Sequence, residues 1–227
     1  IWLMTVSVSH LLEQSSTQLQ DQNNERWPLS ELFGYMNAGV RETFWLQPIE
    51  FRQWRILMLQ EGPRQVFSDV FRILDLTTNI KSGDYNTGVV RGRSLRRVSL
   101  DRLDFFTPDW VASTAASQVK EFALDTIDRQ AFWVFPPNDG TGMIESNTIV
   151  KPVALSEPTD PELLASYDPL EIDIGSEFSP ALVYYILSRA WAKDSDFAGN
   201  MDISTRYYGL FKSVLAGNST EVGSGDS

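Results

Sequence analysis

The chain has no cysteine and a single histidine, His10, among its 227 residues. Without thiols it forms no disulfide, no thiolate metal site and no cysteine nucleophile. His10 lies in a polar run near the N-terminus, so we interpret it as a surface residue of a helix. That interpretation leaves no imidazole for a Ser-His-Asp triad or a histidine-rich metal site. We therefore expect no catalytic residue of these classes and no metal ion.

Positive charge is also scarce, because 19 Lys and Arg oppose 30 Asp and Glu and the net charge is −11. Proteins that grip duplex DNA neutralise its phosphates with cationic side chains, so this balance argues against DNA binding. It is compatible with a wall past which DNA slides. No apolar run approaches the roughly 20 residues that cross a bilayer, and no phosphate-binding glycine motif occurs. We expect a soluble protein without membrane contact and without a cofactor.

Apolar residues make up 42% of the chain, and near the N-terminus they recur at helical spacing. Two amphipathic helices are predicted, the second with Pro28 as its first residue and Gln47-Pro48 as its end. Gly34 and Gly39 lie inside the second helix, where we expect both to pack closely against another helix. The predicted apolar faces are Val8, Leu11, Leu12, Ser15 and Leu19 in the first helix, and Leu29, Leu32, Phe33, Met36, Val40, Thr43 and Phe44 in the second.

From about residue 54, short runs of β-branched and aromatic residues alternate with turn signals, which is typical of strands. The predicted strands are WRILML, VFRILDL, VVRGRSL, VKEFALDTI and AFWVFPP, with EGPRQ and NIKSGDYNTG as turns. A helical turn is predicted from Ser99 to Phe106. Residues 131–152 are predicted to form a β-hairpin around Asp139-Gly140.

Helical spacing returns after a Pro-rich, acidic stretch. Ser179-Pro180 is a favourable helix start, and DSDFAGN separates that helix from another, which predicts a terminal αα-hairpin. The predicted apolar faces of this hairpin are Val183, Ile186, Leu187, Ala190 and Trp191, followed by Ile203, Tyr207, Leu210, Phe211 and Val214.

Helices at both ends and strands in the middle predict an α+β fold. We expect a helical bundle built from both chain ends, an inserted antiparallel β domain and an extended C-terminal tail. The predicted boundaries are 1–53 and 179–215 for the two parts of the helical domain, 54–155 for the β domain, 156–178 for an acidic linker and 216–227 for the tail.

The tail has too little apolar content to repay the entropy of ordering, so we expect it to be disordered in a free monomer and held by a partner chain. It consists of Ala216, Gly217, Asn218, Ser219, Thr220, Glu221, Val222, Gly223, Ser224, Gly225, Asp226 and Ser227.

Opposite charges are segregated along the chain. Basic residues crowd one segment, whereas residues 152–188 contain seven carboxylates and neither Lys nor Arg. The two blocks can meet within one fold or between neighbouring copies, and a solvated basic strand and a nucleic-acid site are the other interpretations. The basic residues are Arg91, Arg93, Arg96, Arg97 and Arg102, of which the first four are candidate contacts between subunits.

The runs RWPLSELFGYMNAGVRETFWLQP, TPDW, AFWVFPP, LVYYILSRAWAKDSDFAGN and RYYGLF follow one another from Trp27 to Phe211. Through the order of these motifs, the chain resembles the head-to-tail adaptor proteins of short-tailed bacteriophages, the group that includes tail tubular protein A. The resemblance implies the fold described above, no enzymatic residues, and a place in the virion at the head-tail junction after assembly in the host cytoplasm.

The resemblance also implies a homo-oligomeric ring of twelve copies that binds the portal protein on one side and the tail nozzle protein on the other, with tail fibres as a further partner. DNA would pass through the ring without specific binding, and residues 216–227 would insert into the portal. Tyr184 and Tyr208 fall outside the apolar stripe of the terminal helices, so we expect them to contact a neighbouring copy.

Two other functions stay open on the sequence. A carboxylate-based hydrolase of cell-wall or capsular polysaccharide is compatible with the abundant acids, of which Asp168, Glu171, Asp173 and Glu177 lie close together. A nozzle or receptor-binding tail protein predicts instead a closed, β-rich fold without a terminal helical hairpin.

Overall fold

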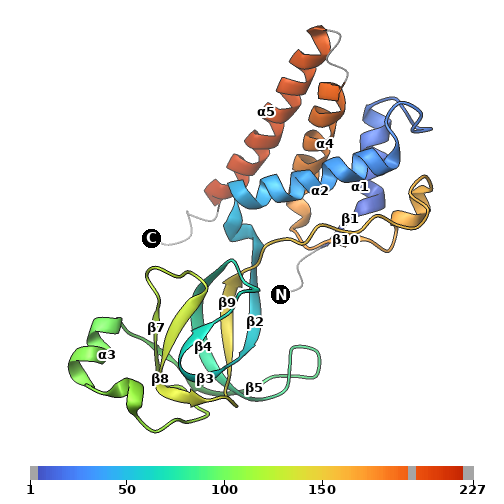
Figure 1. Ribbon diagram of the computed structural model, residues 1–227. Helices are drawn as coiled ribbons and strands as arrows, with labels where there is room; N and C mark the ends of the chain where they lie inside the picture. Colours follow the sequence, from blue (N-terminus) through green and yellow to red (C-terminus); the bar gives the residue numbers. More distant parts are fainter. Residues whose placement is uncertain (1–4, 194–197, 222–227) are drawn as a thin grey trace. The chain divides into compact units, whose positions relative to one another are not determined.

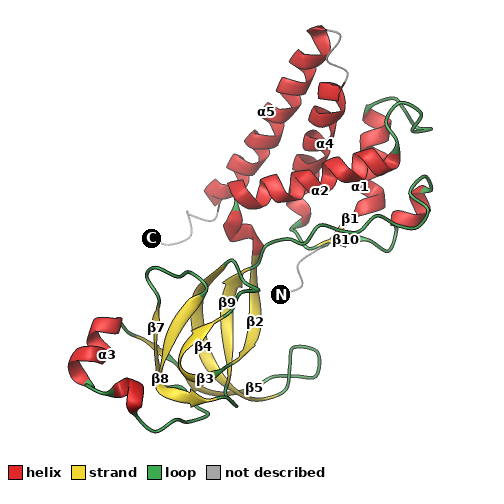
Figure 2. Ribbon diagram, viewed as in Figure 1, coloured by secondary structure: helices red, strands yellow, loops and turns green. Residues whose placement is uncertain are grey.

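The computed structural model of the chain describes residues 5–193 and 198–221 (Figure 1). It divides into two compact units, the helical unit, Ile1–Phe51 with Pro152–Ser227, and the β unit, Arg52–Lys151. Figure 2 shows the long helices in the first unit and most strands in the second. The fold is α+β, as the sequence predicts.

The described residues of the helical unit form four α-helices: α1 (Val8–Gln18), α2 (Leu29–Leu46), α4 (Ser179–Lys193) and α5 (Ala198–Glu221). Helices α4 and α5 pack side by side, and α1 and α2 pack against α4 (Figure 1). The predicted faces of α1 and α2 are confirmed, because their residues are buried. Helix α2 begins at Leu29, one residue after the predicted start, with Pro28 as its N-cap.

The predicted face of α5 is wrong in part. Among the side chains that the structure describes on this helix, the buried ones are Ser204, Phe211 and Leu215, whereas Leu210 is 46% exposed. The small side chain of Ser204 lies against α4, where its hydroxyl donates to the carbonyl of Ser188 at 2.8 Å. A polar residue thus occupies a buried position that an apolar periodicity cannot reveal, and the buried stripe is narrower than predicted.

The acidic stretch that the sequence places as a linker belongs to the core of the helical unit. Its short elements are η3 (Leu164–Tyr167), β10 (Glu171–Ile172) and η4 (Ser176–Phe178), and β10 pairs antiparallel with β1 (Val6–Ser7). Four of its apolar side chains are buried, and the ring of Tyr167 lies 5.2 Å from that of Phe33. The buried residues are Tyr167, Ile172, Ile174 and Phe178.

The C-terminal segment differs from the extended tail that the sequence suggests, because α5 continues to Glu221. Once a helix is nucleated each further residue adds a backbone hydrogen bond, and one glycine costs only about 1 kcal/mol relative to alanine. Gly217 therefore does not end the helix. Residues 222–227 of the predicted tail, and the side chains of residues 218–221, lie outside the part that the structure describes.

The β unit consists of two four-stranded sheets, in the orders β2-β9-β4-β5 and β3-β8-β7-β6. Between them lies an apolar core that includes Leu57, Leu76, Phe122, Phe132 and Ile144. The strands are β2 (Arg52–Met58), β3 (Glu61–Val66), β4 (Arg72–Ser82), β5 (Val90–Ser94), β6 (Arg96–Arg97), β7 (Glu121–Leu124), β8 (Ala131–Asp139) and β9 (Met143–Ile149).

The predicted hairpin over residues 131–152 is wrong, because β8 and β9 lie in different sheets and each pairs with other strands. The segment EGPRQ is likewise strand β3 and not a turn. Strand β2 continues through a bend into β3, and β8 continues through a bend into β9. The antiparallel pairing of β2 with β9 therefore continues as the pairing of β3 with β8, from Arg52↔Ile149 in one sheet to Val66↔Ala131 in the other. Strands that change sheets at a bend are typical of orthogonal sheet packing.

The bend between β8 and β9 is held by the side chain of Asn138, which is fully buried. Its carbonyl oxygen accepts from the backbone N–H groups of Gly140 and Gly142 at 2.9 and 3.1 Å, and its amide donates to the carbonyls of Ala116 and Ser117. A Cβ on Gly142 would stand 2.5 Å from the Ser117 carbonyl oxygen. The hydrogen bonds from Asn138 to Ala116 and Ser117, which are distant in the sequence, thus make this turn a corner between two sheets and not the loop of a β-hairpin.

Helix α3 (Leu100–Phe106) confirms the predicted helical turn and lies on the β unit. Its N-cap is Ser99, whose hydroxyl accepts from the N–H of Arg102 at 3.3 Å. Leu103 and, after the helix, Trp110 are buried and pack with Ala123 in a small second core. None of the described helices is both long and apolar enough to cross a membrane.

Candidate interface surfaces

Arg91, the first of the predicted subunit contacts, has its partner within the β unit. Its guanidinium donates to Oε1 of Glu145 at 2.6 Å, and Glu145 is only 6% exposed. The same carboxylate accepts from Thr77 at 3.0 Å and from Tyr85 at 3.1 Å. The hydrogen bond from Arg91 lowers the pKa of Glu145 against the opposing effect of burial, and the two hydroxyl groups add to the lowering. Arg91 thus compensates a buried charge.

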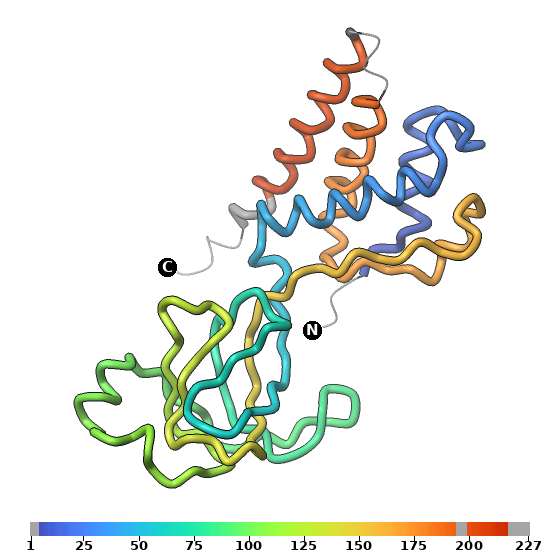
Figure 3. Tube along the Cα trace, in the orientation of Figure 1, coloured from blue at the N-terminus to red at the C-terminus, as the bar shows by residue number. Residues whose placement is uncertain are grey.

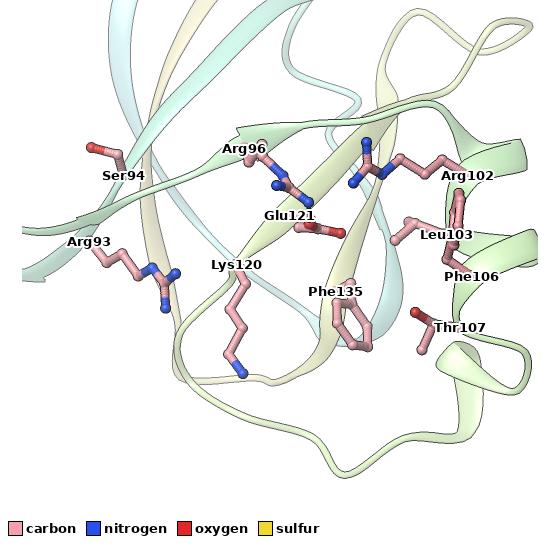
Figure 4. A pocket seen from close by; sticks show the side chains of 10 residues that line it. All are labelled: Arg93, Ser94, Arg96, Arg102, Leu103, Phe106, Thr107, Lys120, Glu121 and Phe135. Carbon is pink, nitrogen blue, oxygen red and sulfur yellow. Dashed lines mark hydrogen bonds and ion pairs between the residues drawn. The ribbon is translucent and has the colours of Figure 1, made fainter.

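Arg93 and Arg96 border a pocket of about 420 Å³ on the β unit, which we call the basic groove (Figure 4). Arg93 comes from β5, Arg96 from β6 and Arg102 from α3, while Lys120 precedes β7. Phe106 and Phe135 supply apolar wall. Arg97, the fourth predicted arginine, is exposed on β6 but does not line this pocket.

The basic groove carries an excess of positive charge, because its ten lining residues include four cations and one carboxylate, Glu121. Glu121 is engaged by Arg96 in an ion pair. The other three cations, Arg93, Arg102 and Lys120, are exposed and form no ion pair with a carboxylate in the described part of the chain. In Figure 4 the side chains of Arg96 and Arg102 point toward the space beside Glu121.

Buried hydrogen bonds hold the strands that carry the groove. The amide of Asn79, which is 2% exposed, donates to the carbonyls of Arg93 and Val119 at 2.8 Å, and its oxygen accepts from the N–H of Val119. The N–H of Arg96 donates to the carbonyl of Lys120 at 3.0 Å. One buried asparagine therefore ties the strand of Arg93 to the residue beside Lys120.

Two phenylalanines stand exposed at the end of α3, next to the groove. Phe105 is 78% exposed and Phe106 is 73% exposed, with their ring centroids 5.0 Å apart. The guanidinium of Arg102 lies 5.7 Å from the Phe106 ring. Exposed aromatic rings beside cationic side chains form a surface that suits a partner with both acidic and apolar groups.

Tyr184 and Tyr208, the two predicted aromatic contacts, are half-buried in the helical unit. Tyr184 stacks on Tyr207 with ring centroids 6.1 Å apart. The hydroxyl of Tyr208 donates to Oε1 of Glu42 at 2.7 Å, and this hydrogen bond raises the tyrosine's pKa. Both rings therefore have contacts within their own chain and also keep exposed surface.

The acidic residues considered for hydrolysis lie on the surface of the helical unit. Asp168, Glu171, Asp173 and Glu177 are all exposed, and Glu171 accepts a hydrogen bond from Thr5. The described residues contain no group of three His, Cys, Asp or Glu that could hold a metal ion. His10 is exposed on α1 and lies within hydrogen-bond distance of Gln14, as the sequence suggests.

The sequence did not predict that Lys120, Phe106 and Phe135 line the basic groove. Lys120 and Phe135 are far from the arginine-rich segment in sequence and reach the groove only through the pairing of β7 with β6 and β8. The Phe105-Phe106 pair could have been noticed, because adjacent residues of a short helix cannot both face the core.

The model of the SU10 adaptor protein family matches residues 6–224, which include the whole β unit and most of the helical unit. No curated protein matches the chain.

Proposed function

The chain belongs to the SU10 adaptor protein family, and we propose that it forms a ring between the portal and the tail nozzle of a short-tailed bacteriophage. Family membership makes it a structural head-tail adaptor of the phage virion, located at the head-tail junction and associated with portal and tail proteins. The details of this role are our proposal: a ring of twelve copies, kinship with tail tubular protein A, and passage of DNA through the ring during ejection. The match over residues 6–224 supports the adaptor role. The proposed details rest on the order of the short motifs between Trp27 and Phe211.

The C-terminal end of α5 is the proposed portal-docking element. Leu215 is buried, and its carbonyl accepts from the side-chain amide of Gln47 on α2 at 3.5 Å. Ala216 and Gly217 are exposed. Leu215 is the last side chain of α5 that the structure describes as buried, and we propose that the segment after it, residues 216–227, enters the portal.

The role that we propose is structural and not catalytic. The acids considered for hydrolysis, Asp168, Glu171, Asp173 and Glu177, are all exposed on the surface of the helical unit. The terminal αα-hairpin of α4 and α5 also distinguishes the fold from the closed β fold expected of a nozzle or receptor-binding protein. The net charge of −11 suits a channel wall that repels phosphates.

Native mass spectrometry of the chain with and without its portal protein tests the proposal. We expect a ring-sized species that binds the portal, and we expect portal binding to be lost when residues 218–227 are removed. This truncation keeps Leu215 and should leave the melting temperature of the chain unchanged. A second truncation that removes only 222–227 separates the end of α5 from the residues beyond it.

The control replaces residues 222–227 by a Gly-Ser sequence of the same length, which keeps chain length but changes side chains. A wild-type chain that stays monomeric and ignores the portal would contradict the proposal. Release of reducing ends from peptidoglycan or capsular polysaccharide by the wild-type chain would contradict the purely structural role.

A further inference from the structure

Three of the four cations of the basic groove, Arg93, Arg102 and Lys120, face solvent without a carboxylate partner among the described residues. A group of acids on the helical unit likewise faces solvent without a described cation as partner. We call residues 157–163 the acidic loop. Its carboxylates, Glu157, Asp160 and Glu162, are exposed and form no ion pair with a described Lys or Arg. Three exposed acids on one unit thus match the three unpaired cations of the groove, Arg93, Arg102 and Lys120.

The acidic loop is held in place by the core beneath it. The hydroxyl of the buried Tyr167 donates to the carbonyl of Pro161 at 2.9 Å. The single hydroxyl proton of Ser166 is shared between the carbonyls of Asp160 and Leu163, each 2.5 Å from the hydroxyl oxygen. These bonds fix the backbone between Asp160 and Leu163. An ordered loop loses less conformational entropy on binding than a free one.

Apolar groups match as well as charges. Leu163, directly after Glu162, is 57% exposed. The groove offers the 73% exposed ring of Phe106 beside Arg102, and the half-buried Phe135. Leu163 can therefore cover an aromatic ring while the neighbouring carboxylate meets a guanidinium, which gives the pairing both apolar contact and charge complementarity.

We propose that the basic groove of one copy binds the acidic loop of the neighbouring copy. The inference rests on the ring proposed above and names the contact that would join its subunits. In a closed ring each copy offers one groove and one loop, so this head-to-tail contact repeats around the ring without leaving either surface free. Because the contact is electrostatic and exposed at its rim, salt should weaken it.

A charge-swap experiment tests the contact. The first variant carries Arg93→Glu and Arg102→Glu in the groove, and the second carries Glu157→Lys, Asp160→Lys and Glu162→Lys in the loop. Each variant alone brings like charges together at every interface, so we expect its association constant for ring formation to fall by at least about tenfold. In an equimolar mixture the two variants should assemble again by alternating around the ring. The acidic groove of the first variant then meets the basic loop of the second, and the basic groove of the second meets the acidic loop of the first.

Two control variants change the net charge equally outside both surfaces. Arg72→Glu with Arg129→Glu matches the groove variant, and Glu13→Lys with Glu25→Lys and Asp202→Lys matches the loop variant, because all five residues are exposed. We expect both controls to form rings as the wild type does. Circular dichroism and the melting temperature should show every variant folded.

Assembly by native mass spectrometry, with the portal present, separates the outcomes. A groove variant that assembles like the wild type, or a mixture that fails to recover, would overturn this inference and leave the proposed ring intact. A wild-type chain that forms no ring with the portal would overturn both. If the groove variant keeps assembly but loses binding of a single-stranded oligonucleotide that the wild type binds, the groove is a nucleic-acid site instead.

Discussion

Gly39 of α2 and Tyr185 of α4 lie so close that a Cβ on Gly39 would stand 2.9 Å from Cδ1 of the tyrosine ring. Glycine at this position lets the aromatic ring pack directly on the backbone of α2. Gly34, one and a half turns earlier, has no atom within 4 Å of the place where a Cβ would lie. The sequence predicts close packing for both glycines, and the structure confirms it for Gly39 and contradicts it for Gly34.

Gly39→Ala should destabilise the chain, whereas Gly34→Ala should not. At position 39 the added methyl group overpacks the contact by about 1–3 kcal/mol, against a helix-propensity gain of about 1 kcal/mol. At position 34 only the gain applies. Urea unfolding followed by circular dichroism measures both variants. A lower midpoint for Gly34→Ala than for Gly39→Ala would contradict the packing described for α2 and α4.

Glu145 should make the free energy of unfolding of the β unit depend on pH. Its folded pKa lies below the ordinary value of 4.5, so its contribution to stability is fully present above that value and is lost as pH falls through the folded pKa. Glu145→Gln should cost about 1–3 kcal/mol at pH 7. Unfolding at several pH values between 7 and 3 should show that the variant loses less stability on acidification than the wild type.

The exposed Glu13 serves as the control for this measurement. Glu13→Gln should leave the pH dependence unchanged. Equal losses on acidification in the wild type and in Glu145→Gln would show that the Arg91 pair does not stabilise the charged carboxylate.

Asn79→Ala should loosen the strand that carries Arg93. The substitution leaves the carbonyls of Arg93 and Val119 and one N–H without their side-chain partner, which should cost at least about 2 kcal/mol. Faster amide hydrogen exchange in β5 and around Val119 should accompany the loss. Asn86→Ala, in an exposed loop of the same unit, should change stability by no more than about 0.5 kcal/mol. Uniform exchange across the β unit in Asn79→Ala would point to global destabilisation instead.

Tyr184→Ala and Tyr185→Ala should separate assembly from folding. Tyr185 is 3% exposed and contacts Phe211 with ring centroids 5.1 Å apart, so its truncation should cost about 3–5 kcal/mol. Tyr184 is half-buried and should lose little stability, whereas its loss should weaken the proposed ring. Thermal unfolding and native mass spectrometry measure the two effects. A large drop in melting temperature for Tyr184→Ala would place this residue in the core and not at an interface.

The sequence predicts what depends on local periodicity. The buried faces of α1 and α2 follow from apolar residues at three- and four-residue spacing, and Ser99 marks the start of α3 by its capping side chain. The prediction fails where a distant segment decides. Asp139-Gly140 gives the same turn signal whether the flanking strands pair with each other or pass into different sheets, and Asn138 decides between these by bonding to Ala116 and Ser117.

The candidate surfaces likewise depend on contacts between segments that are distant in the sequence. The arginine-rich segment is visible in the sequence. Its division into Arg91, paired with Glu145, and Arg93, at the groove, depends on the shifted register between β4 and β5 and on the residues that distant strands bring beside each arginine. Likewise, acidity alone predicts a solvated linker for residues 156–178. The burial of Tyr167 and Phe178 shows that aromatic residues within an acidic stretch are better guides to the core than its average charge.

Arg52, the first residue of β2, pairs with Ile149 at the end of β9, so the chain enters and leaves the β unit on neighbouring strands, as the trace in Figure 3 shows. A domain whose two ends are adjacent can be exchanged for another without stretching the fold that hosts it. For a phage lineage this geometry makes the β unit a replaceable module. Recombination can then replace the β unit and retain the described helices of the other unit.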